Sequence, residues 1–562
     1  MLAVHGQENQ HSEEDMARTK SQVTTAGGTR RKIERIRKRE LKSPDPMVKI
    51  GLTEEYDQID FHVSHKYQIV SLSGEPVISG KDDDEHWHVV PNETFEARAI
   101  YSVLITAFAK RDSADKLRRT LSNQNQVARV VEAGEEILID NRLIANNIKY
   151  RILVGRWPTE REARQHLDEF KEEFAPRVVR QIIRTGGGSI EIYNDDFTKS
   201  FMVQDGFRII PKSDSALVTL RNVREGTGFH WEREVDRTYP GIVEVRVDHR
   251  GLLMAMVELP LELYLKGVVP AEMPASYPLD GLKAQAIAAR SEVLSKIGLK
   301  HPNDPFDLCA HVHCQAYSGS MHYDERASEA VEETRGMVLM QDGRVAEAVY
   351  HSCCGGHTED KINVWNPPPA SHLQGGWDAA KNVEVPRELD LSKEIDFEKW
   401  INMKPAVWCN TAAFNDIPNI LHNAEKYFRW EVNYSRRELE DIINRKSGED
   451  IGELLDIVPL QRGNSGRLME IEILGTLKSL RVQRELNIRN ILSLRYLWSA
   501  AFTVHVEQGA DGRPLNFILR GGGWGHGVGM CQVGAGVMAA KKHDYKQILS
   551  HYYPGTTVEK VY

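Results

Sequence analysis

Residues 259–298 have the sequence LPLELYLKGVVPAEMPASYPLDGLKAQAIAARSEVLSKIG, and they carry the strongest structural signal in the chain. Pro278 suits the first turn of a helix, because proline lacks the amide hydrogen that a helix start leaves unpaired. Apolar side chains then recur at steps of three and four residues. This spacing predicts one helix with an apolar face made of Leu279, Leu282, Ala286, Ala289, Val293 and Ile297.

Glu272 lies just before this helix, between Pro270 and Pro274, and its other neighbours are apolar. If the carboxyl group is buried, its pKa should rise, because desolvation disfavours the charged form. A raised pKa is what a general acid needs near neutral pH. A glutamate between prolines can equally be structural or exposed. Three polar residues of the helix form a solvated face in the simplest interpretation: Lys283, Gln285 and Arg290.

The composition is that of a globular protein, with 562 residues, 41% hydrophobic and 27% charged. This length predicts roughly two to four domains. The net charge of −9 gives no global basic field, so nucleic acid is not an expected partner. No apolar run reaches about 18 residues, so we expect no transmembrane helix.

Residues 1–46 are polar, and near their end residues 29–41 form the basic stretch TRRKIERIRKREL. They contain no apolar core of a signal peptide. We expect a disordered polar tail, with a nucleic-acid or membrane-surface arm as the alternative.

The remaining chain divides into blocks by its local patterns. Short alternating runs predict strands over 47–96, and a strand–turn–helix order predicts an α/β insertion over 97–185. Further strands and the Glu272 region fill 186–369. A segment rich in Pro, Asn and Trp, 370–428, is interpreted as an insertion, and mixed signals fill 429–562. In the last block SRRELEDIINRKSG predicts a helix that Gly448 can cap.

The six cysteines are few for this length and do not form the framework of a small disulfide-rich domain. Cys309 and Cys314 lie in KHPNDPFDLCAHVHCQAY, near His301, His311 and His313. Thiol and imidazole groups at this spacing suit zinc. The alternative is buried thiols with surface histidines.

A second cysteine segment, YHSCCGGHTED, covers residues 350–360. Adjacent cysteines rarely form an unstrained disulfide. Cys354 and His357 could complete a zinc site with Cys309 and Cys314, although a tight glycine turn is favoured. A Cys/His nucleophile would need a nearby base and helix N-terminus, which nothing local supplies.

A glycine-rich run, RGGGWGHGVGMCQVGAGVMAAKK, covers residues 520–542. It contains neither GxxxxGK[ST] nor GxGxxG, so nucleotide binding is unsupported.

Several of these segments together resemble the stage II sporulation protein D / LytB amidase-enhancer family. They include LPLELYLKGVVPAEMPASYPLDGLKAQAIAARS, DLCAHVHCQAYSG, TRGMVLMQDGRVAEAVYHSCCGGHTED and GGGWGHGVGMCQVGAGVMAAKKHDYKQILSHYYPGT, in the family's order. YRILVGRWPTEREARQHL resembles SPOR domains, which bind septal glycan strands. The resemblance implies an α+β fold: a β-rich multi-segment domain with a catalytic helix region and a small α/β SPOR-like insertion.

For function, the resemblance implies a lytic transglycosylase of glycan strands stripped of stem peptides, with Glu272 as its single catalytic acid. It also implies a structural zinc held by Cys309, Cys314 and His301. Lys283, Gln285, Arg290, Trp524 and His526 are the expected substrate-binding residues, with Trp524 offering a sugar-stacking face and His526 a polar group near Glu272. A purely structural loop with a buried Trp and His is the alternative. Cys531 is expected to be a packed thiol.

Two other functions stay open. One is a non-catalytic enhancer or glycan-binding partner of a cell-wall amidase. The other is a zinc amidase, which would normally need an open metal position and at least two His ligands. The expected partners are peptidoglycan glycan strands and an amidase. The expected location is the cell envelope or the exterior, because the substrate lies there, although no export signal is visible.

Overall fold

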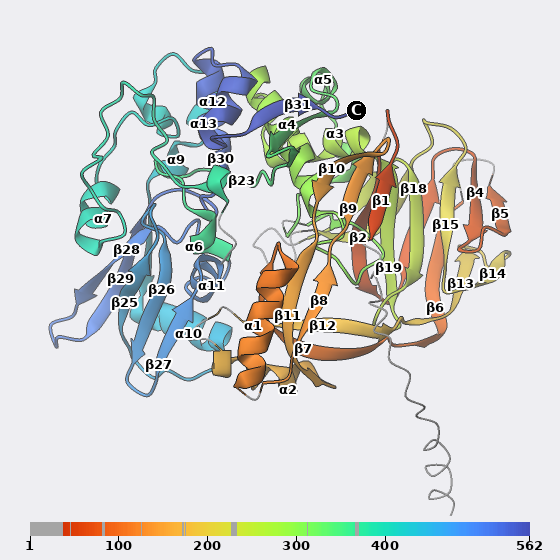
Figure 1. Ribbon diagram of the computed structural model, residues 1–562, viewed down its shortest axis with the longest axis horizontal. Helices are drawn as coiled ribbons and strands as arrows, with labels where there is room; N and C mark the ends of the chain where they lie inside the picture. The colour runs from red at the N-terminus through yellow and green to blue at the C-terminus, as the bar shows by residue number, and fades with distance from the viewer. Residues whose placement is uncertain are drawn as a thin grey trace, which may run out of the picture. The chain divides into compact units, whose positions relative to one another are not determined.

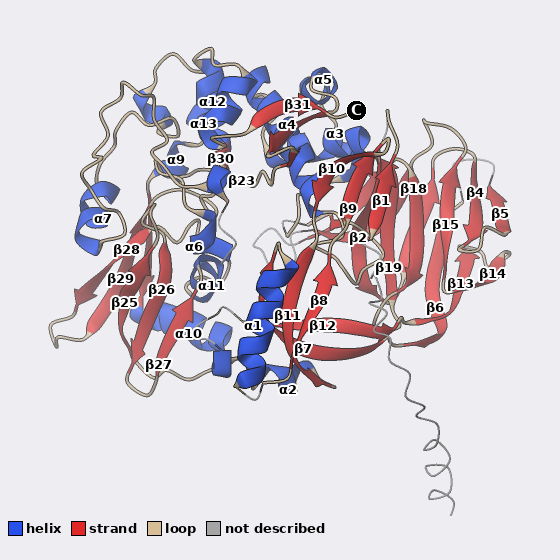
Figure 2. Cartoon of the chain, in the orientation of Figure 1, coloured by secondary structure: helices blue, strands red, loops and turns tan. Residues whose placement is uncertain are grey.

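Two largely antiparallel sheets, built from strands between residues 47 and 309, pack against each other. In the computed structural model, Figure 2 shows their strands in red. The first sheet has seven strands, in the order β20 (Leu308–Cys309), β2 (Met47–Tyr56), β19 (Leu253–Pro260), β18 (Ile242–Val247), β15 (Gly206–Pro211), β4 (Tyr67–Ser71), β5 (Pro76–Gly80). The second sheet has six, in the order β14 (Ser200–Gln204), β13 (Gly187–Asn194), β6 (Trp87–Phe95), β3 (Ile59–Val63), β16 (Val218–Glu225), β17 (Arg233–Tyr239). Only β20 runs parallel to its neighbour.

The structure describes residues 37–44, 46–80, 85–124, 126–170, 174, 176–225, 233–311, 313–365 and 370–562. Within β3, buried and half-buried residues alternate, as expected for a strand with one face in a core. The rings of Phe61 and Phe207 lie 6.2 Å apart and join the two sheets. The buried Trp87 indole donates a 2.6 Å hydrogen bond to the Tyr67 hydroxyl, so its polar atom is satisfied.

The block predicted over 97–185 contains a separate antiparallel sheet of order β12 (Arg177–Arg184), β7 (Arg98–Phe108), β11 (Lys149–Trp157), β8 (Ala128–Ala133). Helices α1 (Arg111–Asn123) and α2 (Glu160–Arg164) accompany it, with the 3-10 turn Asp168–Phe170. Thr159 and Glu162 form a reciprocal capping box that fixes the start of α2. Val103, Ile105, Ile152 and Val154 give this sheet its own core.

Part of the same block leaves this sheet and joins the main core. The hairpin β9 (Glu136–Ile139) and β10 (Arg142–Asn146) pairs with β1 (Lys38–Leu41) through β9. The side-chain amide of Asn147 donates to two carbonyls at the end of helix α4 (Leu279–Lys296). Most of the predicted tail 1–46 lies outside the described residues. Its last part is not a tail, because β1 pairs with β9 and Leu41 is buried.

The strand-rich half leads into a group of helices around α4 (Leu279–Lys296). Figure 1 shows α12 (Gln532–Ala540) and α13 (Tyr545–Tyr552), at the blue end of the chain, beside the green α4. Helices α3 (Leu261–Glu272) and α5 (Glu325–Glu333) also contact α4. The small sheet β22 (Arg344–Val345), β21 (Met337–Gln341), β31 (Thr557–Lys560) packs there as well.

Helix α4 begins after Pro278, as predicted, but it does not have one apolar face and one solvated face. Residues 281, 282 and 284–294 are all buried, so neighbours enclose the helix on nearly every side. The prediction of a solvated polar face was therefore wrong for Gln285 and Arg290, both of which are fully buried.

The C-terminal block holds two three-stranded sheets over a second core. Their orders are β24 (Trp430–Ser435), β29 (Pro514–Gly521), β28 (Phe502–Gln508) and β25 (Leu454–Arg462), β26 (Leu468–Gly475), β27 (Ser479–Gln483). Helices α10 (Arg436–Ser447) and α11 (Glu485–Ile491) pack with them. The predicted helix is confirmed in α10, which buries Leu439, Ile442 and Ile443 and ends at Gly448 with φ +72°.

The described residues between 350 and 428 form only short elements: β23 (Tyr350–His351), α6 (Lys361–Trp365), α7 (Glu394–Ile401), α8 (Asn419–His422), α9 (Glu425–Phe428) and the 3-10 turns Ser371–Leu373 and Thr411–Ala413. Leu373, Phe397, Trp400 and Leu421 nevertheless belong to the main core. The strand-rich α+β class predicted from the sequence is confirmed. None of the helices in the described ranges is both long and apolar enough to cross a membrane.

A buried ion pair fastens α3 to α4. The Arg290 guanidinium donates to both oxygens of the Glu262 carboxylate at 2.8 and 2.6 Å, and both side chains are almost fully buried. The Tyr562 hydroxyl donates to the same carboxylate, and Arg290 also donates to the carbonyl of Met337. The pair therefore ties the C-terminal residue to the helical centre.

We expect Arg290→Ala to lower the free energy of unfolding by about 3–5 kcal/mol, because it leaves the Glu262 carboxylate buried and unpaired. Lys283→Ala, on the same helix, removes only a partly exposed pair with Glu333 and should cost under about 1 kcal/mol. Urea unfolding followed by circular dichroism measures both. Equal losses in the two variants would contradict the assignment.

Candidate functional site

Glu272 is the last residue of α3, and the loop that follows α4 closes over its carboxylate. The backbone N–H of Ala316 donates a 2.7 Å hydrogen bond to Oε1. The side chain of Gln532, the first residue of α12, hydrogen-bonds to the same carboxylate. Three segments far apart in the sequence therefore meet at this one side chain.

Burial raises the pKa of Glu272 to about 7, and the hydrogen bonds from Ala316 and Gln532 only partly offset this rise. The position at the carbonyl end of a helix acts in the same direction as burial, because the helix dipole disfavours a negative charge there. Among the described residues, the groups that shift this pKa include no second carboxylate. Glu272 can therefore donate a proton and take one back near neutral pH.

A group of amides and phenols surrounds this carboxylate. Gln532 donates to the Gln285 side-chain carbonyl at 3.3 Å, and the Tyr350 hydroxyl donates to Gln315 at 2.7 Å. The Nε2 amide of Gln285 has no hydrogen-bond partner among the described residues. The hydrogen bond to Gln285 therefore keeps the side chain of Gln532 in contact with Glu272.

The structure corrects the expected roles of the polar residues on α4. Arg290 cannot reach a polymer, because it is fully buried and its guanidinium is occupied by Glu262. Gln285 is also fully buried, so it acts on the site only through Gln532. Lys283 is paired with Glu333 of α5. Its contact with substrate stays a prediction.

The glycine-rich run lies against the 350–357 segment. β23 pairs in parallel with β30 (Met530–Cys531), and a bridge joins Cys353 to Trp524. Gly529 has φ +71°, and a Cβ there would lie 2.0 Å from the carbonyl oxygen of Val349. The glycine is needed because the two backbones approach this closely.

Trp524 and His526 are brought into an aromatic group. The Trp524 ring lies 4.6 Å from that of Tyr427 and 6.0 Å from that of Trp498, and His526 lies 4.7 Å from Trp365. Of these five residues, Trp365 is exposed and the other four are half-buried. Burial lowers the pKa of His526 well below its usual value, so the ring is neutral. Gln532, which sequence reasoning missed, is the residue of this run that hydrogen-bonds to Glu272.

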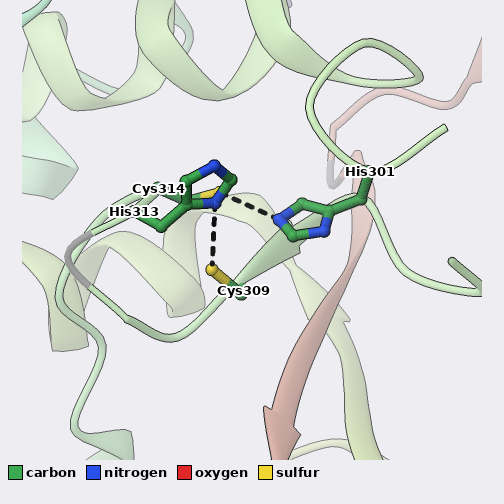
Figure 3. A group of neighbouring side chains, drawn as sticks. All are labelled: His301, Cys309, His313 and Cys314. Atoms are coloured by element: carbon green, nitrogen blue, oxygen red, sulfur yellow. Dashed lines mark hydrogen bonds between the residues drawn. The ribbon is translucent and has the colours of Figure 1, made fainter. Parts of the chain in front are cut away.

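Four possible metal ligands converge after α4, as Figure 3 shows: His301, Cys309, His313 and Cys314. Their ligand atoms all lie within 4.8 Å of one another. Nε2 of His301 lies 3.3 Å from the Cys314 sulfur, and Nδ1 of His313 lies 3.7 and 3.6 Å from the two sulfurs. The predicted trio is brought together, and His313 joins it. His311, the other nearby histidine, is not in the group.

The donor set fits zinc, which prefers four nitrogen and sulfur ligands in closed structural sites. Asp304 accepts a 2.9 Å hydrogen bond from Nδ1 of His301, which leaves Nε2 free to face the thiols. Such carboxylate partners commonly orient metal-ligating histidines. Cys314 is only two residues before Ala316, so this group also fixes the loop that holds Glu272.

Cys354 and His357 do not join Cys309 and Cys314, so the idea that they complete that site was wrong. Cys354 instead lies with Asp378, Cys409 and Cys531 in a second group. His357 has its Nδ1 at 2.7 Å from the carbonyl of Thr358. The glycine turn favoured from the sequence fits Gly355 and Gly356, which both have positive φ.

Family models match three segments of the chain. A SPOR domain model matches residues 97–180, a model described as stage II sporulation protein matches 249–341, and a domain of unknown function, DUF8618, matches 359–529. The last match contains the segment 370–428, whose boundaries as an insertion stay a prediction.

Three relatives illustrate the similarity. An uncharacterized protein of Brachyspira hyodysenteriae is 31% identical over 314 residues, or 56% of this chain and 70% of that one. The amidase enhancer of Bacillus subtilis is 30% identical over 300 residues, 52% of this chain and 40% of the relative. Stage II sporulation protein D of Bacillus subtilis is 22% identical over 329 residues, 56% and 78%.

These matches support a cell-wall-related function. The chain belongs to the stage II sporulation protein D family and carries a SPOR domain within it.

We expect the stability of the protein to depend on pH through Glu272. Its pKa is about 7 in the folded state and 4.5 ordinarily, so the folded protein binds the extra proton between these values. Stability should therefore fall as pH rises through this window. In Glu272→Gln this dependence should disappear, leaving a variant at least as stable as the wild type at pH 8.

Thermal unfolding at a series of pH values measures this difference. Glu329→Gln, which changes an exposed carboxylate on α5, is the matched control and should follow the wild type. If the curves of Glu272→Gln and the wild type run parallel from pH 4 to 8, the raised pKa is refuted.

Proposed function

We propose that this protein is a lytic transglycosylase that cleaves peptidoglycan glycan strands between MurNAc and GlcNAc, with strands stripped of stem peptides as its preferred substrate. The observation that carries the proposal is the carboxyl group of Glu272, whose burial raises its pKa to about 7. A group poised at this pKa suits one residue that acts first as acid and then as base.

The chemistry needs only one carboxyl group. Protonated Glu272 gives its proton to the glycosidic oxygen as the bond from C1 of MurNAc breaks. The Glu272 carboxylate then removes the proton from the MurNAc 6-hydroxyl, whose oxygen attacks C1 and closes a 1,6-anhydro ring. Hydrolytic glycosidases need a second carboxylate as nucleophile or to activate water. Here the nucleophile belongs to the substrate itself, so proximity replaces a positioned water.

The hydrogen bonds around Glu272 suit this exchange of roles. The N–H of Ala316 and the amide of Gln532 stabilise the carboxylate form, and burial stabilises the acid form. Trp524, Trp365 and His526 offer ring surfaces on which a sugar can stack. The SPOR domain supports glycan binding and would raise the local concentration of strands. This substrate implies a location in the cell envelope or outside the cell.

A structural zinc is part of the proposal. Cys309, Cys314, His301 and His313 would hold it, and the ion would supply a rigid anchor for the loop that carries Ala316. Four protein ligands leave no open position for water, so these residues do not suit the zinc of an amidase.

A second candidate function is a non-catalytic enhancer of a cell-wall amidase. It is supported by the 30% identity to the relative named amidase enhancer. The two functions differ in a simple way. A transglycosylase releases products alone, whereas an enhancer changes digestion only when the amidase is present.

We expect the purified protein to release products with 1,6-anhydro-MurNAc ends from denuded glycan strands. Glu272→Gln should lower the rate by at least about 100-fold, since general acid–base catalysis typically supplies this factor or more. Glu329→Gln, the exposed control, should retain the wild-type rate. Mass spectrometry of the digest identifies the ends. Only reducing MurNAc ends, or no product, would exclude the transglycosylase.

The rate should also report the acid form of Glu272. Because the reaction begins from the protonated carboxyl group, kcat/KM should fall as pH rises through about 7. Initial rates at saturating and limiting glycan across pH 5–9 measure the profile. A kcat/KM that still rises above pH 8 would assign the first step to another group.

We expect Cys309→Ser to lose one zinc ion per chain and to lower the transglycosylase rate, because the Ala316 loop loses its anchor. His311→Ala, which alters a neighbouring histidine outside the group, should keep the zinc and the rate. Metal analysis of the purified variants decides this. Full zinc content in Cys309→Ser would refute the assigned ligands.

A further inference from the structure

A second cluster of thiols lies buried behind the glycine-rich run. It joins Cys354, which follows β23, Asp378, Cys409 and Cys531, which ends β30. One ligand atom from each residue lies within 4.8 Å of the other three, and all four residues are buried. The Cys354 sulfur lies 3.3 Å from the Cys409 sulfur and 3.1 Å from Oδ2 of Asp378.

These separations match the ligand shell of a single ion. With zinc–sulfur bonds of about 2.3 Å, tetrahedral geometry places two thiolate sulfurs roughly 3.8 Å apart. The three cysteines are free thiols, and 3.3 Å is well beyond the roughly 2.05 Å of a disulfide bond. Cys353 is equally buried, and its thiol hydrogen-bonds to those of Cys409 and Cys531, but it is not among the four residues whose ligand atoms all converge.

Backbone amides point at the sulfurs in the manner of metal-bound thiolates. The N–H of Cys354 donates to the Cys531 sulfur at 3.3 Å, and the N–H of Gly534 donates to the same atom at 3.4 Å. The N–H of Gly356 donates to the Cys354 sulfur at 3.2 Å. These bonds favour the charged thiolate, which is the form that binds metal.

The carboxylate of Asp378 is oriented by neighbouring side chains, as the carboxylate ligands of metal sites commonly are. The Tyr552 hydroxyl donates to its Oδ1 at 2.8 Å, and Nε2 of His551 lies 3.3 Å from the same oxygen. This leaves Oδ2 facing Cys354. Gly534 keeps the space open, because a Cβ there would lie 2.8 Å from Oδ2 and 2.1 Å from the Tyr552 hydroxyl.

The charges also call for a cation. The side chain of Asp378 is fully buried, and His551 is its nearby basic partner among the described residues. The guanidinium of Arg429 is committed to carbonyl oxygens of Ile401, Gly355 and Trp400. A carboxylate buried among thiols is costly unless a cation compensates it.

We propose that Cys354, Asp378, Cys409 and Cys531 form a second, structural metal site for one soft divalent cation of the zinc type, separate from the group at Cys309 and Cys314. Binding replaces the thiol protons by the ion, releases them to solvent and changes no oxidation state. The site joins the 350–357 turn, the 370–428 segment and the start of α12. It thereby fixes Gln532, the neighbour of Cys531. The proposal is independent of the transglycosylase reaction.

Metal content of the full-length protein tests the site. After purification in reductant and removal of loose metal, the wild type should hold two zinc ions per chain, and Cys409→Ala one. Cys309→Ser should also hold one, and the double variant none. Cys353→Ala removes the adjacent buried thiol that contacts Cys409 and Cys531, and it should keep both ions because Cys353 is not one of the four ligands; loss of an ion in this variant would refute the ligand set. Circular dichroism checks that each variant is folded.

Cobalt substitution reports the kind of ligand directly, through the absorption spectrum of the bound ion. In Cys309→Ser reconstituted with Co²⁺, the second site should give thiolate-to-cobalt charge-transfer absorption and the intense visible bands of a tetrahedral ion. Asp378→Asn should weaken or shift these bands, and Cys409→Ala should abolish the charge-transfer band.

Two results would overturn the proposal. One is equal metal content in the wild type and Cys409→Ala, with no charge-transfer band in Cys309→Ser. The other is a wild type in which two of these thiols resist alkylation until reductant is added, since that identifies a disulfide in place of a metal site. A zinc that is lost in Cys409→Ala but kept in Cys309→Ser would support this site while refuting the first.

Discussion

The complete enclosure of α4 is the constraint on which the helical centre depends. A helix surrounded on nearly every side must satisfy its polar side chains internally, since an unpaired buried group costs stability. Arg290 meets this demand through Glu262, and Gln285 meets part of it through Gln532. The first contact fastens α3, whose last residue is Glu272, and the second fastens the start of α12. The contacts that satisfy the buried polar side chains of α4 therefore also position Glu272, the candidate acid.

The two candidate metal-binding groups are linked to Glu272 in a similar way. The loop after α4 carries Cys309 and Cys314 and then supplies the Ala316 N–H that bonds the carboxylate. The run before α12 carries Cys531 and then supplies Gln532. Each residue that hydrogen-bonds to Glu272 therefore lies one or two positions after a cysteine of one of the two clusters: Ala316 follows Cys314, and Gln532 follows Cys531. In this arrangement, metal ions would stiffen the site without taking part in the reaction.

Much of the fold could be predicted from local patterns. The α4 start at Pro278, the α10 stripe with its Gly448 cap and the Thr159 cap of α2 all follow from spacing and capping rules, which act within a few residues. The burial of α4 could not be predicted this way. Its hydrophobic spacing indicates one face, whereas small residues such as Ala284 and Ala288 let neighbouring helices approach the other faces.

The sequence by itself determined the family motifs, the Glu272 candidate and the proximity of His301, Cys309 and Cys314, because these three candidate ligands lie within fourteen residues on one loop. Only the tertiary structure decided which distant residues complete each group. Gln532 reaches Glu272 across 260 positions through the packing of α12 on α4. Cys354, Asp378, Cys409 and Cys531 meet only because β23 pairs with β30 and the 370–428 segment folds into the same core. Local spacing carries no information about such contacts, since they depend on how whole elements pack.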